Sequence, residues 1–115
     1  MARILSVSYD ESLLHSRQML LQEQGHEVVS ALGFAQAMQL CKSSGEFHLF
    51  ILGHSIPHPD KETLIREFRA HCDGPVMALV KWAEQPVTGA DYHVEPDPRQ
   101  VIDLVAQVTS HGKSD

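Results

Sequence analysis

Short apolar runs alternate along the chain with longer segments in which apolar residues recur at helical spacing. The runs predict strands at residues 4–8, 26–32, 47–52, 76–80 and 91–94. Helical spacing predicts helices at residues 11–24, 34–43, about 60–70 and from 98 onward. The run at 47–52 is apolar apart from His48, which is typical of a central parallel strand covered on both faces.

Residues with capping preferences mark several helix ends. Asp10 stands where the first helix needs an acceptor for its unpaired amides, and Gly25 follows that helix where a left-handed residue is favoured. The start of the last helix is marked in the same way by Asp97, Pro98 and Gln100.

Each predicted helix has one apolar face, which we expect to point into a core. In the first helix this face consists of Leu13, Leu14, Leu20 and Leu21. In the second helix it consists of Phe34, Ala37, Met38 and Cys41. Between the third strand and third helix, residues 53–60 contain two prolines and a glycine, which predict a loop.

The regular alternation of strands and helices predicts one α/β domain over residues 1–115, a parallel sheet with helices on both faces. Residues 111–115 are expected to form a frayed tail. Cys41 and Cys72 lie far apart in helical patterns, so we expect two buried thiols and no disulfide.

The net charge of the chain argues against two classes of partner, nucleic acids and membranes. The formal net charge is −6 and the nine basic residues do not cluster, so we expect no binding to nucleic acid and no basic membrane patch. The N-terminal residues lead directly into a strand without the apolar stretch of a secretion signal. A cytoplasmic location is therefore expected.

Five local patterns, in this order and at these spacings, resemble the receiver domain of response regulators in two-component signalling. They are Arg3–Val7, Gln24–Val29, Ile56–Pro57, Gly74–Leu79 and Gly89–Tyr92. The resemblance runs from residue 3 to about residue 108. It implies a flavodoxin-like (βα)5 fold, a doubly wound parallel sheet with strand order 2-1-3-4-5, and chemistry at the carboxyl ends of the strands.

In that family an acidic pair after the first strand binds magnesium, and an aspartate ending the third strand accepts a phosphoryl group. A Thr or Ser after the fourth strand and a Lys after the fifth contact the phosphate. The corresponding positions here hold Ser8, Tyr9, Gly53, Val80 and Glu95. Glycine has no side chain to accept a phosphoryl group, and a glutamate would repel one. We therefore expect the scaffold without the phosphotransfer reaction.

The connection from the fourth to the fifth strand is short. Residues 81–90 hold Pro86 and Gly89, and a parallel crossover with its helix takes at least about 10–12 residues. We expect this helix to be shortened or missing. The sheet face left bare must be covered by the connection, by a second subunit or by a partner. Trp82 and Val87 are placed to provide this cover, with Trp82 either in a local core or at an interface. The residues expected at a partner interface are Lys81, Trp82, Val87 and Tyr92, together with the last helix.

Other chemistry has weaker signals. His54 and His58, with Asp10, are candidate ligands for zinc or nickel. The His-x3-His spacing suits a helix, however, and Pro57 interrupts it, so we expect no metal. Ser55 lacks the G-x-S-x-G context of a hydrolase nucleophile, and no phosphate-cradling glycine motif occurs. We expect neither an enzyme nor a cofactor.

The expected function is an atypical receiver-like (pseudo-response-regulator) signalling domain. It would bind another signalling protein, or a second copy of itself as a homodimer, without aspartyl phosphorylation. The alternative is a sensor of a small ligand or a metal that uses the loop from His54 to Asp60.

Overall fold

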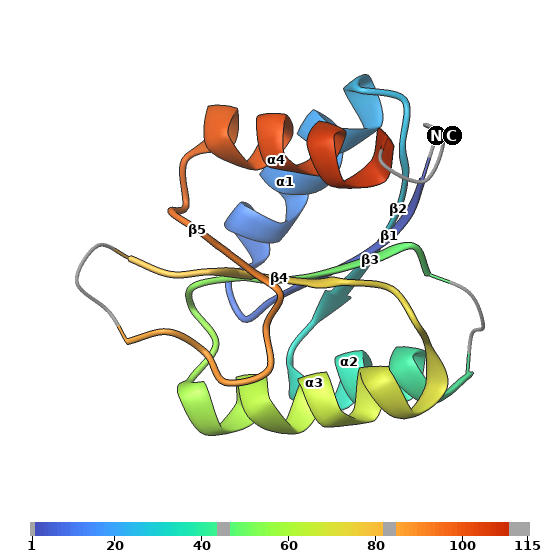
Figure 1. The fold of residues 1–115 in the computed structure, drawn as a ribbon, viewed down its shortest axis with the longest axis vertical. Coiled ribbons are helices and arrows are strands. Elements are labelled where there is room, and N and C mark those ends of the chain that lie inside the picture. The colour runs from blue at the N-terminus through green and yellow to red at the C-terminus, as the bar shows by residue number, and fades with distance from the viewer. Residues whose placement is uncertain (1, 44–46, 82–84, 111–115) are drawn as a thin grey trace.

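A computed structural model describes residues 2–43, 47–81 and 85–110. Five parallel strands form one sheet in the order β2-β1-β3-β4-β5, and this confirms the expected topology (Figure 1). The elements are, in chain order, β1 Arg3–Ser8, α1 Glu11–Glu23, β2 Glu27–Leu32, α2 Phe34–Ser43, β3 Leu49–Leu52, α3 His58–His71, β4 Val76–Leu79, β5 Tyr92–Val94 and α4 Pro98–Ser110.

Helices lie on both faces of the sheet and create two cores (Figure 1). Under α2 and α3 the core includes Phe50, Leu64 and Phe68, and the rings of Phe50 and Phe68 stack with centroids 4.3 Å apart. Under α1 and α4 the core is built from side chains such as Leu21 and Met77. No helix in the described part of the chain is long and apolar enough to cross a bilayer.

The helix ends follow the local sequence closely. The Asp10 carboxylate accepts a hydrogen bond of 3.1 Å from the amide of Leu13, so it caps α1 as expected. After that helix, Gly25 has a φ of 92°, which is the conformation that favours glycine. The Asp97 carboxylate accepts from the amide of Arg99 at the start of α4.

Two expectations about helices are wrong. The loop before α3 ends at Pro57, because the helix already begins at His58. Pro59 fits there, since amides of the first turn have no partner within the helix. Leu13 is 38% exposed and does not belong to the inner face of α1. Among the residues of α1, that face is formed by Leu14, Arg17 and Leu21.

The connection between β4 and β5 contains no helix in its described residues, 80–81 and 85–91. Instead its second half lies against α3 (Figure 1). Arg69 of α3 donates to the carbonyl of Gly89 at 2.7 Å and to the Asp91 carboxylate at 2.8 Å. That carboxylate also accepts from the amide of Val76 at 2.8 Å. The connection is thereby tied to both a helix and a strand.

Val87 covers the sheet face that the missing helix leaves bare. Its side chain is 2% exposed and belongs to the core under α2 and α3. Of the options that the sequence left open, the connection itself supplies this part of the cover, because Val87 packs into the core. A part for Val87 in a partner interface stays a prediction. Tyr92 is half-buried against the other core, and Lys81 is exposed. Trp82 lies outside the described residues.

Replacing Val87 with Ala tests whether the connection is part of the core. We expect the free energy of unfolding to fall by about 2 kcal/mol, because a buried valine loses most of its apolar area. The neighbouring Thr88 is exposed, so Thr88→Ala should change it by less than about 0.5 kcal/mol. Urea denaturation of both variants measures this difference. Equal effects would mean that Val87 contributes nothing to the core.

Candidate functional site

The carboxyl ends of β1, β3, β4 and β5 meet at one edge of the sheet. Val7 is in register with Leu52, and Leu79 with Val94. Beyond these pairs, Gly53 donates its amide to Val7 O at 2.9 Å and Val80 donates its amide to Val94 O at 2.9 Å. The positions that the resemblance assigns to phosphate chemistry therefore lie along the same edge.

Hydroxyl groups occupy the end of β1. Ser8 is fully buried, and its Oγ donates to Asp10 O, accepts from the amide of Asp10 at 3.0 Å and lies 3.3 Å from Ser55 Oγ. Ser55 Oγ also accepts from the amide of Tyr9 at 3.1 Å. These neutral groups satisfy one another. They hold the loop after β3 against the end of β1 without offering a pair of carboxylates.

Tyr9 and Asp60 form a second link across this edge. The Tyr9 hydroxyl donates to Asp60 Oδ2 at 2.7 Å. Burial, together with this hydrogen bond and the negative charge of Asp60, raises the pKa of the Tyr9 hydroxyl above its ordinary value. The hydroxyl therefore stays protonated over the physiological range and keeps the carboxylate engaged.

A buried arginine lies next to Gly53 at the end of β3. A Cβ built on Gly53 would stand 3.0 Å from Arg17 Nη2 and 3.1 Å from Val7 O. Real Cβ atoms are rarely this close to a neighbour. The guanidinium thus takes space that a side chain at position 53 would need. The position of the Arg17 guanidinium therefore favours a glycine at position 53.

Arg17 is almost completely buried, with 7% of its surface exposed. Its Nη1 donates to Ser6 Oγ at 2.9 Å and to Val7 O at 3.3 Å. Among the described residues, no carboxylate forms an ion pair with it. Burial alone lowers the pKa of Arg17 to about 10, because the low-dielectric surroundings disfavour the charged form. The guanidinium remains a cation at neutral pH.

A second basic side chain reaches this edge from the other face. Lys61 of α3 is fully buried, and its Nζ donates to Leu79 O at the end of β4, at 3.4 Å. At the end of β5, where the family has its lysine, Glu95 is exposed. Basic groups therefore enter the site from two helices rather than from the fifth strand.

The candidate metal ligands are not brought together. Among the described residues, no group of three His, Cys, Asp or Glu side chains could hold a metal ion. His58 Nε2 lies 3.1 Å from Gln85 O, in the connection between β4 and β5. The Asp10 carboxylate caps α1.

Sequence reasoning missed Arg17 and Lys61, although the spacing held a signal for both. Arg17 lies three residues after Leu14 and four before Leu21, which places it on the inner face of α1. Lys61 lies three residues before Leu64 in α3, with the same consequence. A basic residue at an inward position of an amphipathic helix predicts a buried polar site.

A double-mutant cycle tests the contact between Gly53 and Arg17. Gly53→Ala should lower the free energy of unfolding by about 1–3 kcal/mol through overpacking. In an Arg17→Met background the cost should shrink by about 1 kcal/mol, since the flexible methionine moves aside. Chemical denaturation of the four proteins gives the coupling.

Gly74→Ala is the matched control for this cycle. A Cβ on Gly74 would meet backbone oxygens of Phe47 and His48 at 2.9 Å. Arg17→Met should therefore leave the loss of stability caused by Gly74→Ala unchanged. If Gly53→Ala lowers the free energy of unfolding by the same amount with Arg17 and with Met at position 17, the predicted contact between Gly53 and Arg17 is contradicted.

Solved structures of receiver domains are similar to this chain over nearly its whole length. The response regulator protein TrrA from Thermotoga maritima, solved in complex with Mg2+-BeF, has a TM-score of 0.76 at 19% identity and covers 94% of this chain and 99% of its own. The CheY-like receiver domain from Methylobacillus flagellatus has a TM-score of 0.78 at 13% identity, covering 94% and 98%. The receiver domain of the hybrid histidine kinase CckA has a TM-score of 0.75 at 25% identity, covering 91% and 96%.

No protein-family model and no curated protein matches the sequence. The likeness therefore lies in the arrangement of strands and helices, at identities of 13–25% for the three structures described. The chain has the flavodoxin-like fold of response-regulator receiver domains.

Proposed function

We propose that the chain is a receiver-like signalling domain that acts through protein contact and takes no phosphoryl group on an aspartate. The observation that carries this proposal is the end of β3. Gly53 offers no nucleophile, and Arg17 Nη2 would stand 3.0 Å from any Cβ placed there. A phosphoryl acceptor at this point lacks its carboxylate, and any side chain there would require the Arg17 guanidinium to shift.

The charges around the edge support the same conclusion. Magnesium is bound through carboxylate oxygens, substrate oxygens and water. The end of β1 offers neutral hydroxyls, and Asp60 is engaged by Tyr9. The buried guanidinium of Arg17 adds a positive charge beside Gly53. A divalent cation placed there would be repelled more strongly than in water, because the local dielectric is low.

The site also lacks the geometry of a hydrolase, which supports a non-enzymatic role. A serine nucleophile needs a base within hydrogen-bond reach. The hydrogen bonds of Ser55 Oγ to described residues go to the amide of Tyr9 and to Ser8 Oγ. His58 Nε2 lies against the carbonyl of Gln85 instead. Ser55 therefore has a structural role in fixing the loop.

A metal sensor in the loop from His54 to Asp60 receives no support from the geometry. The described residues contain no cluster of ligands. Internal contacts already use Ser55, His58 and Asp60 of this loop.

The surface beside the short connection is the contact surface that we favour. A groove of about 530 Å3 runs between α3 and this connection, where a helix between the fourth and fifth strands would lie. Glu62, Ile65 and Arg66 line its α3 side. The groove combines apolar area with charges of both signs, as protein-binding surfaces do. Lys81 and Tyr92 remain candidate contacts near the same edge of the sheet.

The partner is another signalling protein or a second copy of this chain. Light scattering over a dilution series separates the two. A mass that rises toward twice the monomer with concentration identifies a second copy, whereas a constant monomer mass leaves another protein as the partner. Arg66→Glu, which reverses one charge in the groove, should weaken self-association if the groove forms the dimer contact.

The absence of phosphorylation is tested with magnesium and beryllofluoride. Backbone amide spectra should show no saturable shifts at Gly53 or at the ends of β1 and β4, because the edge has neither an acceptor nor a magnesium site. A receiver domain with an intact acceptor, treated in parallel, shows that the reagent is active. Saturable shifts at Gly53, or an acid-labile phosphate on any aspartate after incubation with acetyl phosphate, would overturn the proposal.

A further inference from the structure

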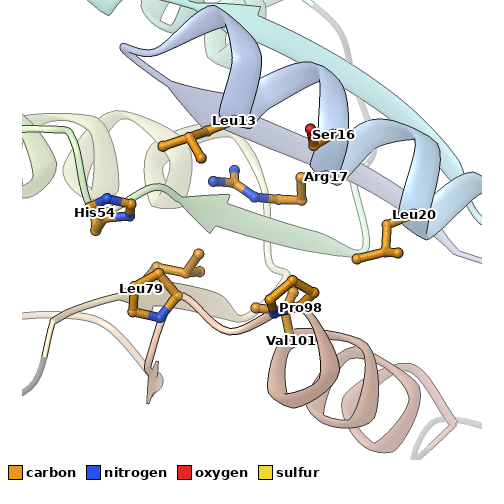
Figure 2. A pocket seen from close by; sticks show the side chains of 9 residues that line it. Leu13, Ser16, Arg17, Leu20, His54, Leu79, Pro98 and Val101 are labelled. Carbon is orange, nitrogen blue, oxygen red and sulfur yellow. The ribbon is translucent and has the colours of Figure 1, made fainter.

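An apolar cavity lies on the other side of Arg17, between α1 and the start of α4. Its volume is about 210 Å3. The apolar lining residues are Leu13, Leu20, Leu79, Pro96, Pro98 and Val101. Figure 2 shows the Arg17 side chain running from α1 along this space, with its guanidinium directed toward the turn that carries His54. The cavity is thus an apolar chamber with a cation at one end.

The cation is incompletely compensated by the protein. A guanidinium has five N–H donors, and the hydrogen bonds that Arg17 makes to described residues all come from Nη1. Nε and Nη2 are left for other acceptors. No carboxylate of a described residue forms an ion pair with Arg17. A buried charge without a counter-ion costs stability, and an anion that binds from outside would offset this cost.

We propose that this cavity binds a small monocarboxylate with an apolar body, whose carboxylate pairs with Arg17 and whose body lies between α1 and α4. A planar guanidinium fits a carboxylate through two parallel hydrogen bonds. The apolar walls formed by Leu20, Leu79 and Val101 would enclose the hydrocarbon part of such a molecule. This ligand site is independent of the proposed lack of phosphorylation, since it lies at the helices and uses no acceptor at position 53.

The size of the cavity limits the ligand. Apolar cavities of about 150 Å3 are large enough to bind benzene. A volume of about 210 Å3 therefore accommodates one six-membered ring with a carboxylate, or an aliphatic acid of similar size. Larger drug-sized ligands occupy pockets of about 300–1,000 Å3 and would not fit.

The chemistry of the lining favours a monocarboxylate over a phosphate. A phosphate carries more charge and usually requires several donors or cations. Here a single arginine supplies the positive charge, and the overall charge of the chain is −6. Most of the remaining lining is hydrocarbon, which favours the binding of an apolar group over that of a hydrated anion.

The experiment is a titration with benzoate, followed by amide spectra, with benzyl alcohol as the uncharged probe of the same shape. Benzoate should produce saturable shifts in α1 and at the start of α4, and inorganic phosphate should produce none there. In Arg17→Met, benzoate binding should weaken roughly 10- to 100-fold, the range expected for a charged hydrogen bond. Benzyl alcohol should bind wild type and Arg17→Met with similar affinity.

Two further variants make the result decisive. Lys42→Met removes an exposed lysine of α2, which lies on the opposite face of the sheet from the cavity, and it should leave benzoate binding unchanged. Leu20→Phe keeps Arg17 and fills part of the cavity, so it should weaken both probes. It also tests the proposal if Arg17→Met does not fold, although we expect that variant to fold because it removes an uncompensated buried charge.

Three results would overturn the proposal. One is the absence of saturable benzoate shifts in wild type at millimolar concentration. Another is benzoate binding that Leu20→Phe does not weaken. The third is an equal loss in Arg17→Met and Lys42→Met, which would show a general charge effect on the acidic protein and not a site.

Discussion

The guanidinium of Arg17 is the group on which the rest of the site depends. It lies beneath the ends of β1 and β3, bonded to Ser6 Oγ and Val7 O, with Nη2 against the backbone of Gly53. Because the arginine is buried and pairs with no carboxylate in the described part of the chain, its charge is weakly screened and acts strongly on the neighbouring groups. The same group limits what position 53 can hold and forms the polar end of the cavity between α1 and α4.

The two faces of the sheet differ in how they are packed. On the face of α2 and α3, stacked phenylalanines and the buried Val87 form a closed core. On the face of α1 and α4, the packing leaves a cavity that ends at a charge. Lys61 reaches the same sheet edge from the closed face. The carboxyl edge therefore combines two basic side chains and several hydroxyl groups with carboxylates that are already engaged, Asp60 by Tyr9 and Asp10 by the start of α1.

Most of the fold was predictable because each element carries its own signal. The apolar run before Gly53 identified the central strand, and Asp10 identified the start of α1 through its capping carboxylate. The short spacing before β5 predicted the missing helix. Pro59 was misleading because a proline is tolerated in the first helical turn, where no amide partner is lost.

The site was only half predictable. The glycine at the end of the central strand can be read from the sequence, but the side chain beside it, Arg17, comes from α1, 36 residues earlier along the chain. Arg17 and Lys61 have the spacing of inward residues, yet their charge suggests the surface. Their burial depends on tertiary contacts with Ser6, Val7 and Leu79 that no local pattern contains.

The contact between residues 17 and 53 also has an evolutionary consequence. An aspartate introduced at position 53 would place its carboxylate next to the guanidinium of Arg17, and the two opposite charges would form an internal salt bridge. Neutralised in this way, the carboxylate would be a poor nucleophile. A free carboxylate at position 53 would thus require a change at position 17 as well, so the two positions are coupled in any series of substitutions.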